Sequence, residues 1–272
     1  MSIDRCWAMS SAVEDRRPSS MRGTQRARSK SSRRLRVFVL FGSLVTVVVA
    51  TPFVEEQLRS FDRARNLAAC RGRLAKVSTA FMTTTSQGRG ELALPPAAIV
   101  SKDGKPLLSR RVALLPALGY QSVYDQFALD EPWDSPRNRA LIPLMPVEFA
   151  CSAGEPASTG RTHLRIFVGN ADPLDTPKPA FDWMRPVDFR EISDGTSSTI
   201  LMLETKESVI WTQPDAIEFK TDQAAYELAS PHTVGAFAIF VDGSIRLLRK
   251  ETDPNAFRSL ITRDGGEVIG DS

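Results

Sequence analysis

Two residues that could share chemistry, His232 and Asp242, stand near the end of the chain with nine residues between them. An imidazole beside a carboxylate is a general acid–base arrangement. The segment between them has the pattern of a strand, however, and a rise of ~3.3 Å per residue separates the two side chains by about 30 Å. We therefore expect Asp242 to form a turn and His232 to lie in a loop or at the start of a strand, with no joint catalytic role.

The other reactive side chains form no recognisable catalytic or metal-binding pattern. Cys151 and His163 could in principle serve as nucleophile and base, but no activating pattern surrounds either residue. The sequence contains no G-x-S-x-G elbow for a serine nucleophile, and its three cysteines and two histidines do not have zinc-site spacing. We expect no enzymatic activity, no cofactor and no metal. Calcium could bind three acidic residues, which without EF-hand spacing are better explained as solvated loop residues: Asp130, Glu131 and Asp134.

The dipeptide Asp242-Gly243 predicts the element that carries these residues. It separates the two halves of GAFAIFVDGSIRLLR, residues 235–249. A two-residue type I′ loop at this dipeptide would place Val241 opposite Ser244. Because the first half is apolar on both faces of a strand, we expect that strand to be central in its sheet.

Further turn and strand signals predict the rest of the sheet. In ISDGTSSTILMLE, residues 192–204, a turn at Asp194-Gly195 precedes a continuous apolar run that is typical of a buried strand. Residues 209–212 suggest its partner strand. Asp103-Gly104 predicts a short hairpin, and either Thr252 or Asp253 is expected to cap a short helix near the C-terminus.

A long helix is predicted from Glu55 to about Met82, where the sequence has no proline and only one glycine. Its apolar residues approximate one stripe at helical spacing, while most of its basic residues fall elsewhere and indicate a solvated face. The residues of this predicted stripe are Leu58, Phe61, Ala64, Ala68, Val77 and Phe81.

An uncharged apolar segment, residues 37–54, precedes this helix. Its 18 residues would span roughly 27 Å as a helix, close to the ~30 Å of a membrane core. Residues 1–36 carry ten Arg or Lys and three Asp or Glu, a net +7, so that the remainder of the chain carries −4. We expect 1–36 to be a disordered basic cytoplasmic tail, 37–54 a transmembrane helix and 55–272 an extracytoplasmic domain.

Two other readings of the apolar segment remain open. A cleaved signal peptide would place the domain on the same side of the membrane but remove its anchor. A buried core helix would need apolar surroundings on every side.

The mildly acidic folded part argues against nucleic-acid binding. If the domain is exported, Cys70 and Cys151 would lie where disulfides persist and could form a bridge between the long helix and the head.

Several segments, in order, resemble the prepilin-type processing-associated H-x9-DG family, also called domain of unknown function 1559. His232, Asp242 and Gly243 match the named motif, and ISDGTSSTILMLE contributes Asp194 and Gly195. The resemblance extends from about Glu55 to the C-terminus through four further segments: KDGKPLLSRRVALLPAL (102–118), LDEPWDSPRNRALIP (129–143), EFACS (148–152) and RSLITRDGGEVI (258–269).

This resemblance implies a pilin-like protein with an α+β fold, in which a long N-terminal transmembrane and stalk helix packs on an antiparallel sheet. No biochemical activity is established for the family, and we expect this chain to act through envelope or secretion-type protein partners, including copies of itself. The chain departs from prepilins at Arg34–Val39, which lack the processing pattern of Gly followed by Phe-Thr-Leu and Glu; we therefore expect a permanent anchor.

An older label of the same family, solute-binding protein, supplies an alternative role. In that reading the domain is an anchored module that binds a solute or a glycan in the loops of residues 152–190. Tryptophan rings can stack on a sugar, although core packing is their usual role. The tryptophans that could do so are Trp133, Trp183 and Trp211.

Overall fold

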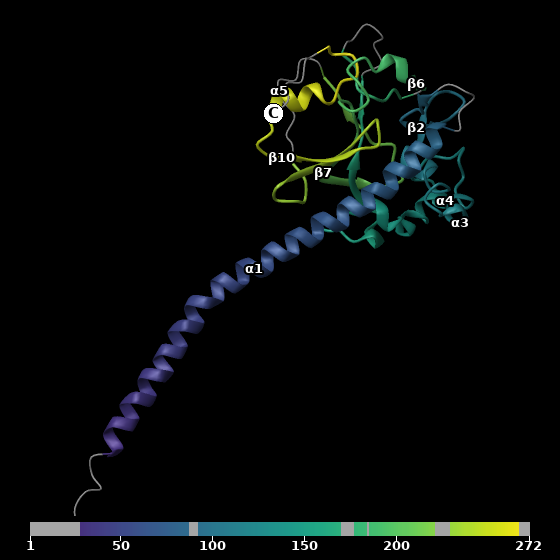
Figure 1. Ribbon diagram of the computed structural model, residues 1–272. Helices are drawn as coiled ribbons and strands as arrows, with labels where there is room; N and C mark the ends of the chain where they lie inside the picture. Colours follow the sequence, from purple (N-terminus) through teal and green to yellow (C-terminus); the bar gives the residue numbers. More distant parts are fainter. Residues whose placement is uncertain (1–27, 87–91, 170–176, 184, 221–228, 267–272) are drawn as a thin grey trace, which may run out of the picture. The chain divides into compact units, whose positions relative to one another are not determined.

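The computed structural model describes residues 28–86, 92–169, 177–183, 185–220 and 229–266, with side chains described from Val54 onward. The chain divides into two compact units, Met1–Leu58 and Arg59–Ser272. Helix α1 (Arg28–Ser86) supplies the described residues of the first unit, and its residues from Arg59 onward belong to the second (Figure 1).

The first unit contains the predicted basic tail and the predicted transmembrane segment. Residues 1–27 lie outside the described part of the chain, and so do the side chains of residues 28–53. Among the described residues, no helix has both the length and the apolar character needed to cross a membrane.

The second unit is an α+β domain built on a four-stranded antiparallel sheet, which confirms the α+β class and the antiparallel sheet of the predicted fold. The strand order is β10-β9-β7-β4, and every neighbouring pair is antiparallel. Strand β9 is central, as its apolar character on both faces predicted. The four strands are β4 (Arg161–Arg165), β7 (Ile200–Ile210), β9 (Gly235–Phe240) and β10 (Ile245–Arg249).

The two faces of β9 belong to two separate cores, because successive side chains of a strand point to opposite faces. Phe237 and Ile239 share one core with Leu74, Val77 and Phe81 of α1. Ala236, Ala238 and Phe240 share the other with residues of the C-terminal helix α5 (Pro254–Ser259) and the turn after it. The sheet therefore packs against α1 with one face and against α5 with the other (Figure 1).

Helix α1 does not bury the stripe that its sequence predicted. Leu58 and Phe61 are exposed, and so are Ala64 and Ala68; of the six stripe residues, Val77 and Phe81 are buried. Burial begins at Cys70, where the helix first meets the sheet and its flanking loops. The stripe that is buried has the helical spacing i, i+4, i+7, i+8, i+11. Its residues are Cys70, Leu74, Val77, Ser78 and Phe81.

Shorter elements surround the sheet. The predicted hairpin at Asp103-Gly104 is confirmed, since β2 (Ala98–Val100) and β3 (Pro106–Ser109) pair around it. Asp253 caps α5 as predicted, accepting hydrogen bonds from the backbone N–H groups of Asn255 and Ala256. The remaining strands are β1 (Ala93–Leu94), β5 (Phe167–Val168), β6 (Val187–Asp188) and β8 (Ile217–Glu218), and the remaining α-helices are α2 (Arg110–Ala113), α3 (Gln121–Tyr124) and α4 (Pro136–Arg139).

One predicted strand boundary is wrong. Residues 209–212 were predicted as a partner of the strand that starts near Ile200, but Val209 and Ile210 are the end of β7 itself. They pair with Thr162 and Arg161 of β4. The intervening residues contain neither glycine nor proline, so nothing in the chain turns it back and β7 continues for 11 residues.

The β9–β10 hairpin differs by one residue from the predicted register. Ile239, not Phe240, is opposite Ile245, and the backbone N–H of Phe240 donates to the carbonyl of Ser244 at 2.9 Å. The loop therefore has three residues, with Gly243 in the left-handed region at φ 84°. Three-residue hairpin loops need a residue of this conformation, and glycine adopts it without steric cost.

This loop also contacts α1. The hydroxyl of Ser78 donates to the carbonyl oxygen of Gly243 at 2.8 Å. A Cβ atom at position 243 would lie 3.2 Å from the Ser78 hydroxyl oxygen and 3.4 Å from Cγ of Met82. Gly243 thus serves both the turn and the close approach of the hairpin to the helix.

Arg111 holds the loops at one end of the sheet together. Its side chain is fully buried, and burial lowers its pKa to about 10, so that it stays charged at neutral pH. The guanidinium donates to the carbonyl oxygens of Trp211 and Leu164 at 2.8 Å each, and to that of Gln213 at 3.1 Å. A buried charge is tolerated here because backbone dipoles surround it.

We expect Arg111→Ala to lower the free energy of unfolding by more than about 3 kcal/mol, because it leaves buried carbonyls without donors. Urea unfolding of the full chain, followed by tryptophan fluorescence, measures this. Arg139→Ala, at an exposed arginine of α4, is the matched control and should change stability by less than about 0.5 kcal/mol. Equal effects of the two substitutions would contradict this role of Arg111.

We expect Gly243→Ala to destabilise the domain by about 1–2 kcal/mol, because a Cβ atom is strained at positive φ and crowds Ser78. Gly72→Ala is the control: Gly72 lies in α1 with nothing within 4 Å of an added Cβ, and alanine there should stabilise the helix by about 0.5–1 kcal/mol. Thermal unfolding monitored by circular dichroism compares the two, and destabilisation by both would contradict the assignment.

Candidate functional site

Four buried side chains from distant parts of the chain meet between α1 and the sheet. Cys70 comes from α1, Cys151 follows the 3-10 helix Val147–Phe149, Glu204 lies in β7 and His232 lies in the loop before β9. Their residues are 1%, 6%, 3% and 5% exposed, respectively. Within the described part of the chain, this is the one group of three or more His, Cys, Asp or Glu side chains arranged to hold an ion. The acidic residues Asp130, Glu131 and Asp134 do not form such a group.

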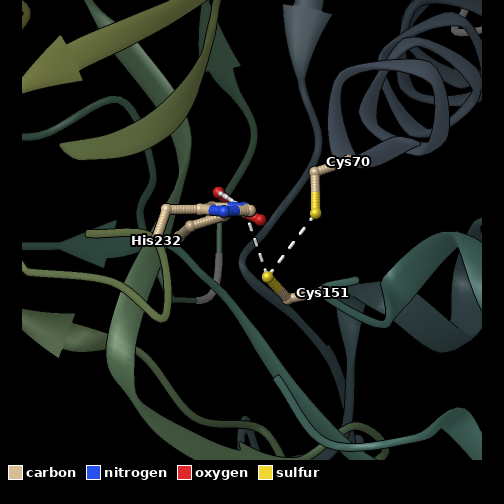
Figure 2. Close-up of side chains that lie close together, drawn as sticks. Cys70, Cys151 and His232 are labelled. Atoms are coloured by element: carbon tan, nitrogen blue, oxygen red, sulfur yellow. Dashed lines mark hydrogen bonds and ion pairs between the residues drawn. The ribbon is translucent and has the colours of Figure 1, made fainter. Parts of the chain in front are cut away.

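The ligand-type atoms of the four residues converge on one point. The sulfurs of Cys70 and Cys151 are 3.5 Å apart, and the sulfur of Cys151 is 3.4 Å from Nε2 of His232. Oε2 of Glu204 lies 3.6 Å from the same nitrogen. All four atoms lie within 4.8 Å of one another. Figure 2 shows Cys151 between the sulfur of Cys70 and the imidazole of His232, with the three side chains pointing toward each other.

Polar contacts hold the segment around Cys151 along α1. Nζ of Lys76 lies 3.1 Å from Oε1 of the buried Glu148, and Nη1 of Arg73 donates to the carbonyl oxygen of Ala150 at 2.9 Å. Ser152 contacts Cys70 twice, because its backbone N–H donates to the sulfur at 3.1 Å and its hydroxyl oxygen also lies at 3.1 Å. The segment therefore follows the helix over about two turns and presents Cys151 beside Cys70.

The sheet positions the other two residues. The carboxylate of Glu204 accepts a hydrogen bond of 3.2 Å from the backbone N–H of Phe237, in the neighbouring strand β9. The ring of His232 packs edge-on against the ring of Phe237, with the centroids 5.8 Å apart. The hydroxyl of Ser230 accepts from the backbone N–H of His232 and donates to the carbonyl of Gly235. This loop geometry directs His232 toward α1.

Burial and proximity change the acidity of all four groups. Burial raises the pKa of the Glu204 carboxyl to about 7. The hydrogen bond between the two thiols lowers the pKa of Cys70 and raises that of Cys151. Burial favours the neutral imidazole of His232, but the contacts with Cys70 and the charge of Glu204 outweigh it and raise the pKa.

The arrangement does not suit a cysteine nucleophile. In a Cys-His-acid set, the thiol contacts one imidazole nitrogen and the orienting acid contacts the other. Here Cys151 and Glu204 both face Nε2 of His232. The adjoining cavity, which both cysteines and Glu204 line, measures about 10 Å³. That volume is about the size of one water molecule or ion and excludes an organic substrate.

The predicted disulfide partners are brought together, with their sulfurs 3.5 Å apart. His232 and Asp242 serve different contacts: Asp242 accepts a hydrogen bond of 2.8 Å from the backbone N–H of Ser244 within the turn. Asp194 accepts from the backbone N–H groups of two glycines near the C-terminus, Gly265 and Gly266. Gly195 has a φ of 94° in the turn after Asp194.

His163, the possible base for a Cys151 nucleophile, is buried. Its Nδ1 lies 2.9 Å from the carbonyl oxygen of Thr205. The imidazole that contacts Cys151 is that of His232. Spacing alone missed the cluster because its four members come from four separate segments. Glu204 offered one usable signal: an acid directly follows a buried apolar run, and a buried carboxylate needs a partner.

The comparisons with known proteins place the chain in a family. The family described as "Protein of unknown function (DUF1559)" matches residues 89–223, about half of the 272 residues. The match includes Cys151 and Glu204, while Cys70 and His232 lie on either side of it. No curated protein and no solved structure matches the chain. The chain belongs to the DUF1559 family.

Proposed function

We propose that this chain is a pilin-like, non-enzymatic envelope protein that is anchored in a membrane and acts through contacts with other proteins, including further copies of itself. Its membership of the DUF1559 family supports this role, as does the packing of a long helix on an antiparallel sheet. The closed, buried cluster supports the absence of catalysis, because its cavity of about 10 Å³ cannot admit an organic substrate.

The observation that carries the proposal is an exposed apolar face on α1. Val54, Leu58 and Phe61 have the spacing i, i+4, i+7, which places them on one side of the helix. They are 52%, 59% and 69% exposed, respectively. Large apolar side chains grouped on a surface mark a contact with another protein or with a membrane. This face begins at Val54, the last residue of the apolar segment 37–54, where neighbouring anchored chains would meet.

The anchor itself is supported by the sequence. Residues 37–54 are uncharged, arginines precede them and Glu55 and Glu56 follow, and the backbone of these residues is helical. The positive-inside rule then assigns the N-terminus to the cytoplasm and the domain to the outside.

We expect the full chain to fractionate with membranes and to resist extraction with alkaline carbonate, because the uncharged, mainly apolar segment 37–54 contributes a large transfer free energy. Deletion of residues 37–54 should move the protein to the soluble fraction. Deletion of residues 1–20 is the control and should leave it in the membrane. Loss of the segment from the mature protein, detected by N-terminal sequencing, would contradict a permanent anchor.

We expect a photo-crosslinking amino acid at Phe61 to give specific adducts in intact cells, because this side chain is 69% exposed on the proposed contact face. The same amino acid at Arg63, two residues along and so on the opposite side of the helix, is the matched control. Gel shifts and mass spectrometry identify the adducts. A ladder of homo-oligomers from position 61 alone supports assembly, whereas equal or absent adducts from the two positions contradict it.

A cleft in the head favours the alternative role, an anchored module that binds a solute or glycan. It measures about 500 Å³ and is lined by Phe167, Leu203, Ile217 and Phe257, with Arg165 and Lys206 also at its surface. The predicted sugar-stacking residue Trp211 does not serve it, since its ring is buried and its Nε1 donates to the carbonyl of Ile142. A rise in melting temperature with one sugar, together with no crosslinking at Phe61, would favour this alternative.

A further inference from the structure

We infer that Cys70, Cys151, Glu204 and His232 form a structural zinc site, which binds one Zn²⁺ between α1 and the head. The inference rests on the position of four buried ligand atoms around one point. It is independent of the proposed anchoring and protein contacts, so that either can fail without the other.

Three of the six distances between the four ligand atoms match the edges of a zinc tetrahedron, and all six are within 4.8 Å. Zn–S bonds of about 2.3 Å and Zn–N or Zn–O bonds of about 2.0–2.2 Å give edges of about 3.3–3.8 Å between neighbouring ligands. The observed separations are 3.5 Å between the sulfurs, 3.4 Å from Cys151 to His232 and 3.6 Å from His232 to Glu204. One ion at the centre could therefore contact all four residues with small shifts of the side chains.

The donor set selects the metal. Two thiolates and an imidazole favour a soft or borderline ion and disfavour calcium and magnesium, which take oxygen ligands. Four protein ligands without access for a substrate are typical of structural zinc sites. The backbone N–H of Ser152 donates to the sulfur of Cys70 at 3.1 Å, which is a second-shell contact of the kind that orients and stabilises a metal-bound thiolate.

A cation also explains why these four groups share one buried point. Two thiols and a carboxylate are groups that lose protons, and in a low-dielectric interior their anionic forms repel one another. One imidazole nitrogen cannot satisfy both the carboxylate of Glu204 and the sulfur of Cys151. A divalent ion contacts each donor through its own lone pair, and its two positive charges offset two of the three negative charges.

A disulfide accounts for fewer of the observations. It would need the sulfurs to move from 3.5 Å to about 2.05 Å. It would join Cys70 to Cys151, but it gives no reason for Glu204 and His232 to face the same two sulfurs. The zinc site uses all four residues. It joins α1, the segment after Val147–Phe149, β7 and the loop before β9, and its binding free energy then stabilises the folded domain.

The test begins with the full chain, purified in detergent without chelators. Elemental analysis should find about one zinc per chain. After the zinc is stripped, the protein should bind Co²⁺. The cobalt-loaded protein should show the d–d absorption of a tetrahedral site and a thiolate-to-cobalt charge-transfer band. Zinc should raise the melting temperature of the stripped protein. These measurements use the unaltered sequence, so they do not depend on whether a variant folds.

Four substitutions then identify the ligands: Cys70→Ser, Cys151→Ser, Glu204→Gln and His232→Gln. We expect each cysteine or histidine substitution to weaken zinc binding by at least about 100-fold, and Glu204→Gln by about 10-fold or more. Cys6→Ser and His163→Gln are matched controls, since they change the remaining cysteine and histidine, and both should retain the metal.

Three results would overturn the inference. One is a metal-free chain, lighter by two hydrogens, whose reduced form takes up no cobalt; this would indicate a Cys70–Cys151 disulfide. Another is a chain with both thiols free to alkylation and no uptake of zinc. The third is equal loss of zinc from the control variants, which would mean that the metal is bound elsewhere.

Discussion

The docking of α1 on the sheet is the contact on which the rest of the domain depends. From Cys70 onward the helix buries a stripe of small and apolar side chains against the face of β9 that carries Phe237 and Ile239. This burial is non-directional, so it brings the two surfaces together without fixing the position of the helix along its axis. Polar contacts supply that register: the pairing of Lys76 with Glu148, the hydrogen bond from Arg73 to Ala150 and the contact of Ser78 with the β9–β10 loop.

The H-x9-DG spacing has a physical explanation in this docking. His232 lies beside Cys151 in the cluster that includes Cys70, while the carbonyl of Gly243 accepts from Ser78. The two ends of the motif therefore contact regions of α1 that are eight residues apart, which is about 12 Å along the helix. The strand between them connects these two contacts. The sequence argument that His232 and Asp242 are too far apart for joint catalysis agrees with this arrangement, in which each end has its own partner.

Much of the fold could be predicted from local patterns. The central position of β9, the hairpin at Asp103-Gly104 and the cap at Asp253 follow from turn residues and apolar runs, while the α+β class was implied by the family resemblance. The errors occurred where tertiary contacts decide. The hairpin register depends on the conformation of Gly243, and the buried stripe of α1 depends on where the helix meets the sheet. No local pattern reports that Leu58 and Phe61 are left exposed.

The candidate site could be predicted only in part, because the pairing of Cys70 with Cys151 followed from a predicted compartment and not from geometry. His232 and Glu204 were visible in the sequence as a motif residue and as an acid after an apolar run, but their convergence is a property of the sheet. Strand order brings β7 beside β9, and the backbone N–H of Phe237 then directs the carboxylate of Glu204 toward α1. Because the four cluster residues come from four separate segments, no motif with a fixed spacing in the sequence relates them.

This domain has two buried polar centres, Arg111 and the cluster of Cys70, Cys151, Glu204 and His232. Their desolvation is compensated in opposite ways, and the comparison indicates what the cluster requires. Arg111 is a buried cation surrounded by carbonyl oxygens of Trp211, Leu164 and Gln213, so the protein itself supplies all the negative dipoles that it needs. The cluster is the reverse case: two sulfurs and a carboxylate face one another, with one imidazole nitrogen among them. Acceptors that face acceptors are stabilised by a proton or by a metal ion placed between them. Because three of the separations are those of ligands around a single centre, a shared cation would contact all four groups at once, whereas protons would satisfy them only in pairs.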